Sequence, residues 1–126
     1  MNSEYTALVT ALKALTQPED PKAKDPVMVQ LPMAEDEWDT RPETVSYGTV
    51  RLDFEADALR GDNQKQSIAY EGSVDLYSLV RDGAGWPALI MQTLEEHCMS
   101  CWYLNHHTHE RETGLWHWEW AFQVEG

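Results

Sequence analysis

Cysteines and histidines in the second half of the chain are the residues best suited to hold a metal. The group comprises His97, Cys98, Cys101, His106, His107 and His109. Cys98 and Cys101 have the Cys-x-x-Cys spacing of zinc sites, in which four sulfur or nitrogen ligands form a tetrahedron. His107 and His109, however, follow the cysteines more closely than in common zinc modules. A periodic pattern also puts both cysteines on the apolar side of a predicted helix, where a thiol behaves as a small hydrophobic group. We therefore expect core cysteines rather than a zinc site.

Other residues with chemical potential give weaker signals. A thioredoxin-like redox pair needs its cysteines at the N-terminus of a helix, whereas Cys98 and Cys101 come at the C-terminal end of the predicted one. Neighbouring acids such as Glu95 and Glu96, or those at 35–37, could perform acid–base catalysis but more often form a solvated surface. The sequence has no glycine-rich phosphate loop and no nucleophile elbow. We predict no catalytic, cofactor-binding or metal-binding residue, and no enzyme activity.

The overall charge is strongly negative. The 126 residues include 22 Asp or Glu and 9 Lys or Arg, which gives a net charge of −13. This charge repels phosphates, so we do not expect a surface that grips nucleic acid. It is explained equally well by solubility, or by a conduit through which DNA passes without adsorbing.

Length and patterning indicate one folded domain over residues 1–126. No apolar run is long enough to span a membrane. The opening Met1–Glu4 lacks the basic and apolar regions of a signal peptide. The two cysteines, Cys98 and Cys101, lie too close together to form a disulfide framework, so a reducing cytoplasmic origin is expected.

The clearest structural element is a strand over residues 115–125. Its large apolar residues occupy every second position: Trp116, Trp118, Trp120, Phe122 and Val124. Polar residues occupy the positions between them: His117, Glu119, Gln123 and Glu125. Because strand side chains alternate between two faces, the pattern predicts one buried and one solvated side. A row of aromatic rings could stack on sugars or bases, but it more often anchors a core.

Periodicity and turn residues predict the remaining elements. They are a helix over 3–16, a proline-rich connector over 17–26, a strand over 27–31, an irregular acidic loop over 33–43, strands over 44–54 and 66–79 joined by a polar connection over 55–64, a helix over 86–99, and a strand over 101–109 that forms a hairpin with the tryptophan strand. Gly72 predicts a bulge or a close backbone approach. The order α-β-β-β-α-β-β predicts an α+β domain, an antiparallel sheet covered on one face by two amphipathic helices.

The whole chain resembles one family, the tail terminator or tail-completion proteins in the neck of long-tailed bacteriophages and prophages. The resemblance rests on the opening helix from Tyr5 to Leu15, the strand from Tyr70 to Ser78 with its Val-Asp-Leu-Tyr core, Leu94-Glu95-Glu96, Trp102-Tyr103-Leu104, and the closing strand from His117 to Val124. The acidic segment 33–43 and the run 106–109 depart from the family pattern.

The resemblance implies a structural protein of the virion. It implies a homohexameric ring that terminates the tail tube, meets the head-side connector or stopper protein, and lets DNA pass through its lumen. A head-to-tail interface that closes on itself produces such a ring. Under this interpretation Glu55, Asp57 and Asp62 are candidate lumen or ring-contact acids. The alternatives are another connector component (an adaptor or stopper), a tail tube protein, or a non-viral ligand- or zinc-binding module.

Overall fold

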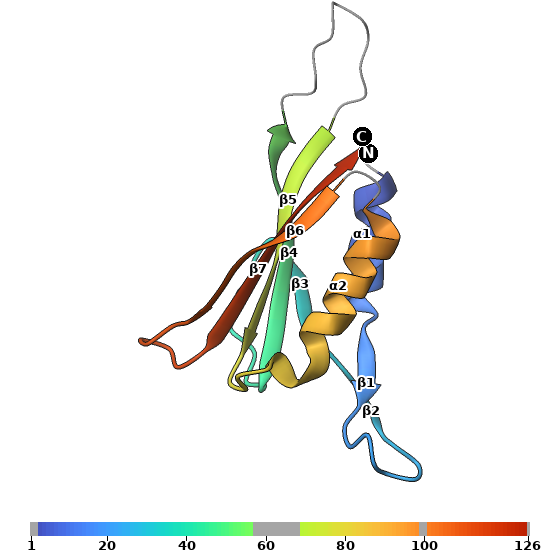
Figure 1. Ribbon diagram of the computed structural model, residues 1–126, viewed down its shortest axis with the longest axis vertical. Coiled ribbons are helices and arrows are strands. Elements are labelled where there is room, and N and C mark those ends of the chain that lie inside the picture. Colours follow the sequence, from blue (N-terminus) through green and yellow to red (C-terminus); the bar gives the residue numbers. More distant parts are fainter. Residues whose placement is uncertain (1–2, 57–68, 99–100, 126) are drawn as a thin grey trace, which may run out of the picture.

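The computed structural model describes residues 3–56, 69–98 and 101–125 of the chain. In this part, two helices pack against a five-stranded sheet and a small two-stranded ribbon projects from one end (Figure 1). The elements in chain order are α1 (Ser3–Lys13), β1 (Thr16–Pro18), β2 (Met28–Gln30), β3 (Met33–Glu35), β4 (Ser46–Ala56), β5 (Ala69–Ser78), the 3₁₀ turn η2 (Gly83–Gly85), α2 (Trp86–His97), β6 (Cys101–His109) and β7 (Trp116–Glu125).

The main sheet has the strand order β3-β4-β5-β7-β6. The three pairings among β4, β5, β7 and β6 are antiparallel, whereas β3 runs parallel to β4. The predicted α+β class is confirmed, but the expectation of a purely antiparallel sheet is wrong. The parallel pairing arises because the chain crosses from β3 to β4 through the loop 36–45 instead of through a tight hairpin turn.

Both helices cover the same face of the sheet, and the apolar side of the tryptophan strand, β7, is buried on that face (Figure 1). Trp120 is fully buried and belongs to the same core cluster as Leu8 and Leu12 of α1 and Ile90 and Leu94 of α2, which are fully buried as well. A large aromatic side chain removes about 150–250 Å² from water. The predicted alternation along β7 is confirmed, because Trp118, Trp120, Phe122 and Val124 are all buried. Trp116, nearest the turn, is only partly buried.

The N-terminal helix is shorter than predicted. It ends at Lys13, and residues 16–18 form β1, which pairs antiparallel with β2. The segment 17–26 is therefore mainly the turn of a ribbon, and the strand predicted at 27–31 belongs to this ribbon rather than to the main sheet. The Gln17 side chain donates a hydrogen bond of 2.6 Å to the carbonyl of Ala84. This bond ties the ribbon to the segment that precedes α2.

The acidic segment predicted as an irregular loop begins with a strand. Met33 lies opposite Gly48 and Glu35 lies opposite Val50 in the β3–β4 pairing. The strand ends at Glu35, because the next residue, Asp36, has a φ of 72° that is incompatible with an extended chain. Beyond it, the indole N–H of Trp38 donates to the carbonyl of Gly48 at 2.9 Å. This bond holds the following loop against β4.

Gly72 permits a close contact across the sheet, as predicted. A methyl group at this position would lie 2.2 Å from the carbonyl oxygen of Arg51 and 2.5 Å from the ring of Phe122. The register shift falls on the neighbouring strand, between Leu52 and Phe54, so the bulge is in β4 rather than in β5. The predicted start of this strand at 66–68 lies outside the described residues.

A run of left-handed residues sets the start of α2. Gly83, Ala84 and Gly85 have φ values of 74°, 56° and 85°, and the Asp82 carboxylate accepts a hydrogen bond from the amide of Ala84 at 2.9 Å. Pro87 then occupies the first turn, where its missing N–H costs nothing. At the other end the prediction is wrong. The helix ends at His97, and Cys101 is the exposed first residue of β6, not a member of the helical stripe.

Candidate functional site

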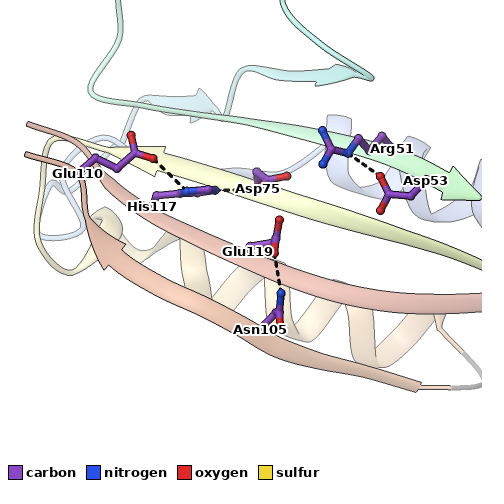
Figure 2. A network of polar contacts seen from close by, with 7 residues as sticks. All are labelled: Arg51, Asp53, Asp75, Asn105, Glu110, His117 and Glu119. Carbon is purple, nitrogen blue, oxygen red and sulfur yellow. Dashed lines mark hydrogen bonds and ion pairs between the residues drawn. The ribbon is translucent and has the colours of Figure 1, made fainter. Parts of the chain in front are cut away.

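The sheet face opposite the helices is polar and hollowed. Alternate residues of β4, β5 and β7 project from it, and the loop 36–45 and the turn 110–115 rise at its margin (Figure 2). The hollow has a volume of about 500 Å³. It is lined by Asp36, Glu37, Trp38, Arg41, Tyr47, Thr49, Arg51, Asp75, Tyr77, Glu110, Thr113, Leu115, His117 and Glu119. We refer to this surface as the open face.

His117 joins two carboxylates at the centre of the open face. Its Nε2 lies 2.6 Å from Asp75 Oδ1, and its Nδ1 lies 3.2 Å from Glu110 Oε2 (Figure 2). The Asp75 side chain is 7% exposed and the His117 side chain 14% exposed. Burial lowers the pKa of His117, but the hydrogen bond to Asp75 and the charges of Asp75, Glu110 and Glu119 outweigh it and raise the pKa above its usual value. The arrangement therefore favours an imidazolium that donates from both nitrogens.

An aromatic stack runs beside this charge cluster. The His117 ring lies 4.3 Å from that of Tyr77, which lies 5.1 Å from that of Tyr47, with both pairs nearly parallel. The three residues come from β7, β5 and β4 at matching register positions. Burial raises the pKa of Tyr77 to about 12, so this phenol remains neutral. At the end of the stack, the guanidinium of Arg41 lies 5.6 Å from the centre of the Tyr47 ring.

A second, smaller cavity adjoins the first and shares Glu119 with it. Its volume is about 150 Å³, and its acidic residues are Asp53, Glu71 and Glu119. Each carboxylate has one neighbour: Arg51 lies 2.7 Å from Asp53, Asn105 donates to Glu119 at 2.7 Å, and Gln123 donates to Glu71 at 2.8 Å.

Ser73 lies on the wall of the smaller cavity. It is 5% exposed, and its hydroxyl has no hydrogen-bond partner within the part of the chain that the structure describes. Buried hydroxyl groups are usually paired. The smaller cavity therefore combines three acids with a polar atom that has no partner there.

These contacts limit what the site can do chemically. A histidine that acts as a general base needs a free ring nitrogen to accept a proton. Both nitrogens of His117 face carboxylates, so this arrangement provides none. The cluster instead holds two acids and a cation in fixed positions on the sheet.

The residues predicted as zinc candidates do not come together. Cys98 is buried at the end of α2, where burial raises the pKa of its thiol to about 12, while Cys101 is exposed. His107 and His109 stack on Trp118 and Trp116, with ring centres 4.3 and 4.4 Å apart. Across residues 3–56, 69–98 and 101–125, the structure contains no group of three or more His, Cys, Asp or Glu side chains placed to bind a metal ion.

The paired acids on α2 lie on its surface. Glu95 accepts a hydrogen bond from the indole of Trp102 at 2.7 Å, and Glu96 accepts one from Gln92 at 3.2 Å. Both are exposed, as predicted for a solvated helix face. Of the acids at 35–37, Asp36 and Glu37 border the larger hollow. The proposed lumen acids Asp57 and Asp62, and the side chain of Glu55, lie outside the described part.

Sequence reasoning did not identify the cluster around His117. It did predict that His117 and Glu119 lie on the solvated side of β7. The missing information was the strand order and register, which place Asp75 opposite Glu119 and Tyr77 opposite His117. The only sequence signal for this cluster was the presence of a histidine and an acid, His117 and Glu119, among the polar residues that alternate along β7.

Comparison with known proteins adds no further assignment. Neither a model of a protein family nor a curated protein matches this sequence. The helices within the described segments are too short and too polar to cross a membrane.

Proposed function

We propose that this chain is a structural protein of a phage neck, which forms a ring that ends the tail tube and joins it to the head-side connector. The observation that carries the proposal is the resemblance of segments spread along the whole chain. These segments correspond to α1, β5, the end of α2, β6 and β7. They comprise three of the five strands of the main sheet and parts of both helices, so the resemblance is spread over several elements rather than confined to a single motif.

The sheet offers an edge suited to subunit contacts. Within the described sheet, β6 pairs only with β7, and its other edge is unpaired. Most residues of β6 are exposed, including Tyr103 (55% exposed) and Leu104 (46% exposed). Unpaired backbone groups on an edge strand can pair with another chain. A head-to-tail contact of this kind builds a closed ring when its rotation closes.

The charge is compatible with a DNA conduit. A ring of six copies would carry roughly −78, which disfavours adsorption of DNA phosphates to its walls. DNA would then pass without specific binding.

Mass measurement and electron microscopy test the proposal. We expect the purified chain, alone or mixed with its tail tube protein, to form rings of uniform size at the end of the tube. Deletion of the gene from its phage or prophage should give tails of uncontrolled length.

A charge on the β6 edge should interfere with the ring. Leu104→Glu should reduce ring formation, whereas Ala88→Glu on the exposed surface of α2 adds the same charge elsewhere and should not. Two results together would refute the proposal: the chain stays monomeric when it is mixed with tail tubes, and deletion of its gene leaves tail length unchanged. Rings found at another level of the neck would instead support the adaptor or stopper alternative.

A further inference from the structure

The two cavities of the open face form one continuous acidic surface. Together they are lined by seven carboxylates: Asp36, Glu37, Asp53, Glu71, Asp75, Glu110 and Glu119. The basic side chains along the same lining are those of Arg41, Arg51 and His117. All three belong to the larger hollow, so the smaller cavity has only acids among its charged lining residues. The two cavities of the open face thus carry excess negative charge.

We propose that the open face binds an extended, arginine-bearing segment of a partner protein, with one guanidinium seated in the smaller cavity. This inference does not depend on the proposed neck function, because it follows from the charge and shape of the surface alone.

The smaller cavity fits the head group of an arginine. Its volume of about 150 Å³ equals that of about five liquid water molecules, enough for a planar group of one carbon and three nitrogens. Its carboxylates accept hydrogen bonds, and the hydroxyl of Ser73 offers another acceptor that has no partner among the described residues. Guanidinium is the side-chain group with the most N–H donors in a fixed geometry, and it pairs with carboxylates through two parallel bonds.

The larger hollow is suited to a second arginine. Tyr77 lies between the rings of His117 and Tyr47, and Tyr47 lies between Tyr77 and the guanidinium of Arg41, so these ring faces are already covered. A second guanidinium would instead pair with the carboxylates of this hollow, such as Asp36 and Glu37, through parallel N–H donors. Because the two cavities share Glu119, a segment lying along β7 would reach both. In an extended segment, arginines at alternate positions point to one side.

A peptide titration tests the proposal. The probe is a capped (Gly-Arg)₃-Gly peptide, with (Gly-Lys)₃-Gly and (Gly-Glu)₃-Gly as comparisons, followed by calorimetry and backbone-amide NMR at low salt. We expect the arginine peptide to bind most tightly and to shift resonances of β4, β5 and β7 on the open face. Affinity should fall as salt is raised.

Paired variants distinguish a site from general charge attraction. Glu71→Gln with Glu119→Gln neutralises the smaller cavity, and the amides that bond these acids can rotate to bond the new side chains. This protein should lose about fivefold in affinity, as expected for two partly exposed ion pairs. Glu19→Gln with Glu96→Gln removes the same charge from the ribbon and α2 and should bind like the parent.

Several results would overturn the inference. One is that the arginine peptide fails to bind, or that it shifts only resonances of the two helices. Others are that both double variants lose affinity equally, or that the lysine peptide binds as tightly as the arginine peptide. The inference would also fail if the parent protein self-associates through the open face and the Glu71/Glu119 variant does not, because the occupant would then be a second copy. The NMR map of the parent protein needs no variant, so a folding defect would leave the test intact.

Discussion

Substitution of Gly72 by alanine tests the packing of the sheet most directly. The added methyl group would lie 2.2 Å from the carbonyl oxygen of Arg51 and 2.5 Å from the ring of Phe122. Separations this short require one of the neighbours to move. The ring can tilt, but the carbonyl belongs to Arg51, which lies opposite Ser73 in the β4–β5 pairing, so its movement would strain that pairing.

The size of the effect follows from these contacts. Overpacking a well-packed interior usually costs about 1–3 kcal/mol, and a clash with backbone should reach about 3 kcal/mol. A domain of this length loses about 3–5 °C in Tm for each kcal/mol, so we expect Tm to fall by about 9–15 °C. Thermal melts followed by circular dichroism, with urea unfolding as an independent measure, would give both values.

Two further variants separate the sources of this strain. Ser73→Ala, at the next position, removes a buried hydroxyl without a partner among the described residues and should leave stability equal or slightly higher. Phe122→Leu combined with Gly72→Ala relieves the ring contact alone. Since the carbonyl is the closer neighbour, the double variant should recover little of the loss. A Gly72→Ala protein that melts within about 2 °C of the parent would refute the reasoning, because neutral surface changes have effects of that size.

Three other predictions concern the open face, the core and the thiols. The pKa of His117 is raised in the folded state, so protonated His117 stabilises the fold fully below its unfolded pKa of about 6.5. This stabilisation is lost as the pH rises through the folded pKa. The urea midpoint of unfolding should therefore fall between about pH 6 and pH 9, and it should fall less in His117→Gln. A pH profile that His117→Gln leaves unchanged would contradict this. Trp120→Ala should lower the free energy of unfolding, measured with urea, by about 3–5 kcal/mol. Trp116→Ala should lower it clearly less, because Trp116 is only partly buried. Equal losses in the two variants would contradict the different burial of the two side chains. An aromatic disulfide reagent should react rapidly with exposed Cys101 and slowly with buried Cys98 until denaturant is added, and Cys101→Ser should remove the fast phase.

Predictions from sequence succeeded where a long periodic pattern was present. The alternation along β7 and the apolar stripe of α2 are dictated by burial on one side, so Trp120 and Cys98 were assigned to the core correctly. The close approach at Gly72 followed from the absence of a side chain in an otherwise regular strand.

The short strands were not predictable in the same way. β1 and β3 have three residues each, too few for a period to emerge, and Pro18 and acidic neighbours suggested loops instead. Cys101 continued the helical spacing of α2 by coincidence, although the helix had already ended at His97. The cluster around His117 depends on pairing between β5 and β7, which are distant in sequence, and no local pattern encodes their register.

The position of β7 between β5 and β6 has a consequence for the route by which the chain folds. Its ten pairings with β5 join segments separated by the whole of α2 and β6, so this seam forms at a high cost in chain entropy. The β6–β7 hairpin can form locally, but it gains its apolar partners only when it docks beneath α1 and α2. Docking of the hairpin should therefore limit the refolding rate, and before it the indoles of β7 would be open to aggregation.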